Sequence, residues 1–113
     1  INENKIDIAK EFATKHNVVL LLKGFNTIIT DGKSLYINPT GSSAMASGGM
    51  GDCLTGIIAS FISQGYDAFT AACVGAYIHG YCGDKLSQKM FCINANHIIE
   101  ALPFIIKEIQ NLE

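Results

Sequence analysis

The aliphatic run at residues 18–22 (VVLLL) is the feature that most limits how this chain can fold. An uninterrupted run of this kind is typical of a strand buried on both faces, and such strands occur in parallel sheets covered by helices. A single strand of this type cannot form a sheet alone. We therefore expect its partner strands in an upstream segment that is absent from these 113 residues, with association of several copies as the alternative.

The segments around this run predict an α/β arrangement. Residues 2–16 have the apolar spacing of an amphipathic helix. Two short β-prone runs, 27–30 and 34–37, flank Asp31-Gly32, a dipeptide that favours a hairpin turn. Helices are predicted over residues 51–64, ending at Gly65, over 67–83, with Asp67 as the N-cap, and over 94–112, with Pro103 near a break or in the first turn.

Composition and charge argue against several classes of function. The net charge is −2 and the basic residues are scattered, so no nucleic-acid partner is expected. No apolar run approaches the roughly 18 residues of a membrane span, and no membrane association is expected. The cysteines form no C-x-x-C pair and are interpreted as small buried residues in a reducing compartment, which predicts a cytoplasmic protein. They are Cys53, Cys73, Cys82 and Cys92.

Several glycines stand directly before the helix predicted at residue 51. Backbone N–H groups in a glycine-rich turn can point into one concavity, and the helix N-terminus adds the positive end of its dipole. We therefore expect Gly48, Gly49 and Gly51 to form an anion site, with phosphate as its guest.

Asp52 follows this loop immediately, although a carboxylate repels phosphate. It would serve as a general base if an alcohol attacked a phosphoryl group held by the loop. An acidic residue in the first turn of a helix is also common, because it interacts favourably with the helix dipole. The residues alone favour neither interpretation of Asp52.

Motifs along nearly the whole chain resemble those of the ADP/ATP-dependent NAD(P)H-hydrate dehydratases, which are ribokinase-like enzymes. The most specific is Met45-Ala46-Ser47-Gly48-Gly49 with Met50-Gly51-Asp52. The others, in matching order, are Lys23-Gly24 with Thr27, Asn38-Pro39-Thr40-Gly41, His79-Gly80, Gly83-Asp84 and Ala101-Leu102-Pro103. The chain departs from the family pattern at Ser42-Ser43-Ala44 and at Asn96.

The resemblance implies that residues 1–113 are the C-terminal part of a single, longer ribokinase-like domain of the α/β class. It implies a carbon–oxygen lyase that repairs the 6S hydrate of NADH or NADPH by phosphorylating the hydroxyl and then eliminating phosphate. ADP or ATP would be the phosphoryl donor, accompanied by Mg²⁺, and we expect a homo-oligomer. These residues alone are expected to be inactive, because the family's hydrate pocket draws on the upstream part.

Residue roles follow from the same resemblance. Asp52 would contact the hydrate and act as the base, while Gly51 and its neighbours Gly48 and Gly49 would hold the transferred phosphoryl group. The nucleotide would lie against one short segment of the chain. That segment consists of Lys23, Gly24, Phe25, Asn26 and Thr27.

Other interpretations stay open at this point. The loop chemistry also suits a ribokinase-like kinase of a vitamin-precursor alcohol, and a non-catalytic fragment could retain only a phosphate-binding nest. Lys23 can be read as an ordinary charge at a strand end. His79 is interpreted as a core histidine with one hydrogen bond, and Asp84 as a helix-end residue that faces solvent or a turn.

Overall fold

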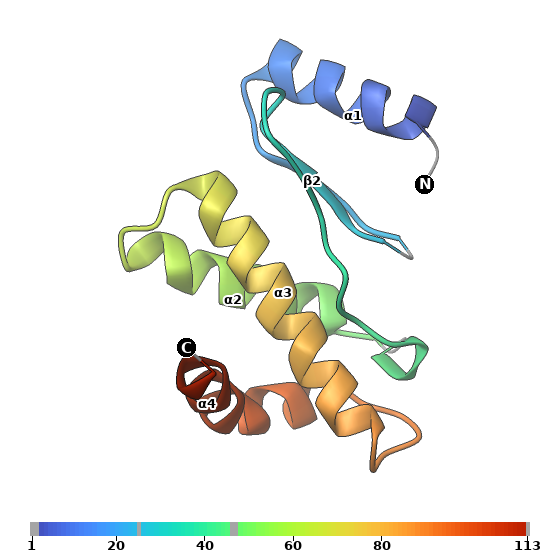
Figure 1. Ribbon diagram of the computed structural model, residues 1–113, viewed down its shortest axis with the longest axis vertical. Helices are drawn as coiled ribbons and strands as arrows, with labels where there is room; N and C mark the ends of the chain where they lie inside the picture. The colour runs from blue at the N-terminus through green and yellow to red at the C-terminus, as the bar shows by residue number, and fades with distance from the viewer. Residues whose placement is uncertain (1–2, 25, 46–47, 113) are drawn as a thin grey trace.

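The computed structural model describes residues 3–24, 26–45 and 48–112. Helix α1 lies on one side of a small sheet, and the remaining α-helices lie on the other (Figure 1). In chain order the elements are α1 (Glu3–His16), β1 (Leu20–Leu22), β2 (Ile28–Thr30), β3 (Leu35–Ile37), the 3₁₀ helix η1 (Ser43–Met45), α2 (Met50–Ser63), α3 (Ala68–Ser87) and α4 (Ala95–Asn111).

The predicted hairpin is confirmed as β2 and β3, which pair antiparallel with Ile28 opposite Ile37. Its turn is closed by the side chain of Asp31, whose Oδ1 accepts hydrogen bonds from the backbone N–H groups of Lys33 and Ser34 at 2.9 and 2.7 Å. Gly32 has a φ of +97°, and a side chain there would overlap Thr14 of α1. The turn therefore packs directly against the first helix.

The strand predicted at residues 18–22 is confirmed over Leu20–Leu22 as β1, although it is half-buried where burial on both faces was expected, and its expected upstream partners stay a prediction. Within the described residues, β1 is an edge strand that pairs antiparallel with β2, in the order β1-β2-β3. Its three residues are half-buried, whereas Ile28 and Ile29 of β2 are fully buried. β2 is more buried than β1 because it is the central strand of the three and is contacted by both α1 and α3.

Two helix predictions also need correction. The helix expected to end near Gly83 continues to Ser87, because this glycine makes room for a neighbour: a side chain at position 83 would overlap Met45. The last helix is one continuous element with Pro103 in its interior, where the ring is exposed and the missing N–H removes a single ladder bond. Asp67 is confirmed as the N-cap of α3, since its side chain accepts from the Thr70 N–H at 2.8 Å.

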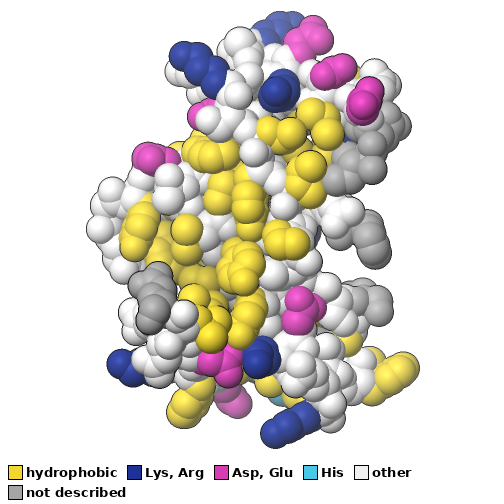
Figure 2. All heavy atoms as spheres, in the orientation of Figure 1, with side chains coloured by type: hydrophobic (Ala, Val, Ile, Leu, Met, Phe, Trp, Pro, Cys, Tyr) yellow, Lys and Arg dark blue, Asp and Glu magenta, His cyan; other side chains and the backbone are white. Residues whose placement is uncertain are grey.

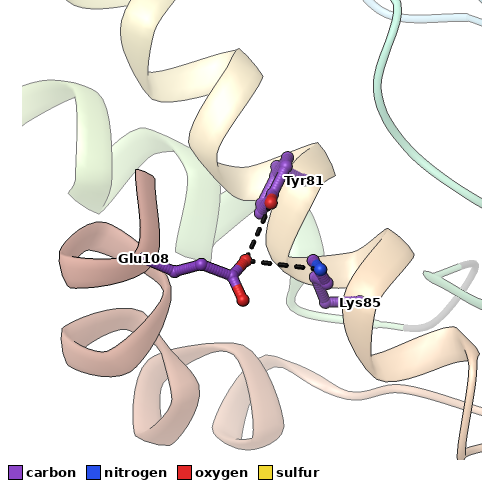
Figure 3. A network of polar contacts seen from close by, with 3 residues as sticks. All are labelled: Tyr81, Lys85 and Glu108. Carbon is purple, nitrogen blue, oxygen red and sulfur yellow. Dashed lines mark hydrogen bonds and ion pairs between the residues drawn. The ribbon is translucent and has the colours of Figure 1, made fainter. Parts of the chain in front are cut away.

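Helices α3 and α4 are joined by an apolar cluster and by a polar network at its edge. The cluster includes Cys82 from α3 and Ile98 and Ile105 from α4. In Figure 3, Glu108 reaches from α4 toward Tyr81 and Lys85 of α3: Tyr81 Oη donates to Glu108 Oε2 at 2.7 Å, and Lys85 Nζ lies 3.4 Å from the same oxygen. These contacts fix α4 against the helix that carries part of the site described next.

All four cysteines are free thiols. Cys82 is buried, as interpreted from its apolar surroundings, but Cys92 is exposed in the turn before α4. Within the described ranges, no helix is both long enough and apolar enough to cross a bilayer.

Candidate functional site

A cavity of about 520 Å³ opens where segments distant in sequence meet. Its walls come from the loop after β1, the segment after β3 at residues 38–42, the first turns of α2 and the middle of α3. Most of the residues expected at a nucleotide site line it together. These are Lys23, Gly24, Asn26, Thr27 and Gly51.

The other predicted site residues lie elsewhere or are not placed. Gly48 and Gly49 form an exposed turn just before α2 and are not among the residues that line the cavity. Asp52 is exposed on the first turn of α2 and also does not line it. Phe25 lies outside the described residues.

The glycine loop leads into α2 through a backbone shape that requires glycine. Gly49 is the N-cap residue with a φ of +88°, in the left-handed region that side chains disfavour. The helix begins at Met50, one residue before the predicted start, and no side chain caps it. Because the first N–H groups of a helix have no partner within it, this uncapped end retains donors for a ligand.

Lys23 brings a positive charge to the same place. A side chain at position 51 would have its Cβ 3.0 Å from Lys23 Nζ, so the ammonium group lies directly against the first turn of α2. The charge and the positive end of the helix dipole therefore coincide, and both favour an anion. Sequence reasoning left Lys23 open as a strand-end charge, whereas the fold places it beside Gly51.

A second hollow, of about 480 Å³, runs along the outside of α2. It shares Lys23, Gly51 and Leu54 with the first cavity. The rest of its wall is mainly aliphatic and includes Leu21 and Ile58. Lys23 and Gly51 thus stand between a partly polar cavity and an apolar groove.

The segment at residues 38–41 is bound to α3 by contacts that sequence reasoning missed. Asn38 Nδ2 donates to the Ala76 carbonyl at 3.1 Å, and Thr40 Oγ1 donates to the Tyr77 carbonyl at 3.1 Å. Asp84 was interpreted as a helix-end residue that faces solvent or a turn; it lies near the end of α3 and faces the loop, where its Oδ2 accepts from the Gly41 N–H at 3.1 Å.

The close approach of this segment depends on Gly80. A side chain at position 80 would overlap the Thr40 hydroxyl and lie 2.7 Å from the Thr40 carbonyl carbon. Ala76, Gly80 and Gly83 are spaced by four and three residues, which places three small residues on one face of α3. That spacing was the sequence signal for a backbone packed against the helix.

His79 also differs from its sequence interpretation. Its Nε2 is buried and has no hydrogen-bond partner among the described residues, although one hydrogen bond was expected. The side chain lines the cavity. Burial lowers the pKa of His79, and the positive charge of Lys23 lowers it further, so the imidazole is neutral at neutral pH.

The sequence of the chain was compared with those of known proteins. The family model for NAD(P)H-hydrate dehydratase matches residues 1–104. The chain belongs to this family. The bifunctional NAD(P)H-hydrate repair enzyme of Moorella thermoacetica is 40% identical to it, over 97% of this chain and 21% of that enzyme. The ADP-dependent (S)-NAD(P)H-hydrate dehydratase of Cenarchaeum symbiosum is 34% identical, over 98% of this chain and 39% of that enzyme.

Solved structures agree with the sequence comparison. The ADP/ATP-dependent NAD(P)H-hydrate dehydratase of Bacillus subtilis, co-crystallised with ATP and Mg²⁺, matches with a TM-score of 0.86 at 31% identity, covering 94% of this chain and 39% of that one. A ribokinase-like superfamily protein of Enterococcus faecalis matches with a TM-score of 0.79 at 32% identity, over 88% of this chain and 35% of that one. The family and the ribokinase-like α/β fold are thereby confirmed. The chain spans about two fifths or less of the relatives it matches.

Proposed function

We propose that this chain provides the nucleotide-binding and phosphoryl-holding part of an ADP/ATP-dependent NAD(P)H-hydrate dehydratase. The observation that carries the proposal is the contact of Lys23 with Gly51 at the start of α2, in a cavity also lined by Gly24, Asn26 and Thr27. An ammonium group and free helix N–H donors at one point suit the phosphates of a nucleotide. The rest of the cavity would hold the nucleoside.

The names of the relatives support an adenine nucleotide as the donor. The Cenarchaeum relative is called ADP-dependent, and the Bacillus relative was crystallised with ATP and Mg²⁺. The substrate proposed for this chain, the 6S hydrate of NADH or NADPH, follows from the same names. Gly48 and Gly49 would extend the phosphate site beyond the cavity, because they lead into the uncapped end of α2.

Asp52 would act as the base in the phosphoryl transfer and contact the hydrate. It would accept the proton of the hydrate hydroxyl as that oxygen bonds to the terminal phosphorus of the nucleotide and the bond from this phosphorus to the departing AMP or ADP breaks. Phosphate would then be eliminated and the dihydronicotinamide ring restored. An exposed position next to Gly51 suits this role, since the carboxylate is open to a substrate arriving from outside the cavity.

Mg²⁺ would enter with the nucleotide. Among the described residues there is no group of three or more His, Cys, Asp or Glu side chains that could hold a metal. Mg²⁺ commonly takes one or two carboxylates together with phosphate and water ligands, so the residues present fit an ion carried on the phosphates. When bound, the ion would neutralise phosphate charge alongside Lys23.

An upstream segment of the same domain would complete the substrate site and cover the apolar surface near α1. Ile8, Phe12 and Val18 are 59%, 46% and 42% exposed, which is unusual for side chains of this size gathered in one region. Figure 2 shows hydrophobic side chains collected in a band along one face of the molecule. Assembly into a homo-oligomer stays a prediction, as does a cytoplasmic location.

The test uses the full-length gene product with the 6S hydrate of NADPH, Mg²⁺ and ADP or ATP. We expect NADPH absorbance to return together with stoichiometric AMP or ADP and phosphate. A folded protein that binds ADP yet forms no NADPH would contradict the dehydratase proposal. Transfer of phosphate to a vitamin-precursor alcohol instead would support the kinase alternative.

A further inference from the structure

The imidazole of His79 carries a feature that the proposed phosphate chemistry does not use. Its Nε2 is buried without a hydrogen-bond partner among the described residues, although the side chain lines the cavity with Lys23 and Gly51. Buried polar atoms in folded proteins nearly always have a partner, because desolvation without a hydrogen bond is destabilising. An unpaired nitrogen at a cavity wall therefore points to a partner that comes from a ligand.

The surroundings of His79 indicate which part of a nucleotide that partner belongs to. Lys23 and Gly51 give the wall of this cavity its positive charge and helix N-terminus, and Met45 and Ala76 add apolar surface suited to a base and a ribose. Burial and the nearby charge of Lys23 both lower the pKa of His79 and keep the ring neutral. A neutral imidazole has one N–H donor and one acceptor nitrogen, which matches the mixed donors and acceptors of a base and a ribose, whereas a phosphate offers acceptors only.

We propose that His79 binds the nucleoside part of the adenine nucleotide through Nε2 and so holds it in the cavity with its phosphates at Lys23 and Gly51. This inference rests on the proposed nucleotide site. His79 is then a positioning residue for the phosphoryl donor: a nucleoside held at α3 fixes how far its phosphates reach along the first turn of α2.

The test compares His79→Leu, which keeps the approximate size without a polar group, with His79→Gln, which keeps a hydrogen-bonding terminus. Binding of ADP and of inorganic tripolyphosphate is titrated calorimetrically in the full-length protein, and ligand-free melting temperatures are measured in parallel. We expect His79→Leu to weaken ADP binding about 3- to 10-fold, the usual range for one lost hydrogen bond. His79→Gln should recover part of that loss, and tripolyphosphate binding should not change.

The ligand-free protein provides the contrast with a purely structural role. Removing an unpaired buried nitrogen should leave the melting temperature of His79→Leu unchanged or higher. A lower melting temperature with unchanged ADP affinity in both variants would overturn the inference, and so would an equal loss of tripolyphosphate binding, which would place the partner among the phosphates. If the parent protein binds no ADP, the proposed nucleotide site itself fails and this inference fails with it. His16→Gln, at an exposed position at the end of α1, is the control for a histidine outside the cavity.

Discussion

Replacing Gly51 by valine is the most direct test of whether the position of Lys23 Nζ beside the first turn of α2 matters for anion binding. The φ of Gly51 is not in the left-handed region, and helix propensity favours valine over glycine, so the backbone should accept the change. The new Cβ, however, would lie 3.0 Å from Lys23 Nζ, and the two methyl groups beyond it would occupy the space beside the ammonium group. Lys23 must then move away from the first turn of α2.

The size of the effect follows from what Lys23 would lose. A hydrogen bond that involves a charged group contributes about 1.5–3 kcal/mol, which corresponds to roughly a 10- to 150-fold change in affinity. We expect Gly51→Val to weaken ADP binding by this amount. Gly51→Ala should lose less than about 10-fold, because a flexible ammonium group can shift by a few tenths of an ångström to accommodate one methyl group.

The same helix offers a matched control. Gly56 is exposed in α2, and a Cβ at that position would meet no atom within 4 Å. Gly56→Val should therefore bind ADP as the parent does, with a similar change in helix propensity. Calorimetric titration of ADP into the full-length variants, with melting temperatures, gives both quantities. Equal ADP affinity for Gly51→Val and Gly56→Val would refute the argument that Lys23 and α2 form the anion site, provided both proteins are folded.

Three further predictions follow from other parts of the structure. Asp52→Asn should lower turnover of the 6S hydrate at least ~100-fold while the melting temperature and ADP affinity change little, because the amide cannot accept the hydroxyl proton; near-normal turnover would make the carboxylate structural. Residues 1–113 alone should show no dehydratase activity and should associate in sedimentation experiments through the exposed apolar surface near α1; a stable, monodisperse monomer would count against this. Gly80→Ala should lower the free energy of unfolding by about 1–3 kcal/mol, because the methyl group would lie 2.7 Å from the Thr40 carbonyl carbon. Gly56→Ala should instead be neutral or stabilising, and urea denaturation of both variants measures the difference.

Local chemistry explains the parts of the fold that the sequence predicts well. The β2–β3 turn depends on Asp31, which accepts hydrogen bonds from residues two and three positions later, and on the positive φ of Gly32. The start of α3 depends on Asp67 in the same way. Such signals need no knowledge of the rest of the fold, so they survive into the structure.

The errors arise where distant segments decide the outcome. The antiparallel pairing of β1 with β2 was not predicted, because the side chains of an aliphatic run indicate burial but not the direction of a neighbouring strand. A glycine such as Gly83 often ends a helix, but here it lies inside α3, where the absence of a side chain leaves room for Met45. The contact of Lys23 with Gly51 has no local signal either, since the residues stand 28 positions apart, and only the family resemblance assigned both to the nucleotide.

The position of Asp52 offers a resolution of the charge conflict raised by its sequence. A carboxylate beside bound phosphate would weaken binding if both lay inside one poorly solvated cavity. Asp52 instead lies on the exposed side of the first turn, while Lys23 and Gly51 line the cavity. Water then screens the repulsion between Asp52 and the phosphates, whereas the attraction of Lys23 acts at the cavity wall. In the proposed reaction the first turn of α2 would then hold the phosphates at Gly51 while the neighbouring Asp52 carboxylate would stay within reach of the hydroxyl that attacks them, as general-base-assisted phosphoryl transfer requires.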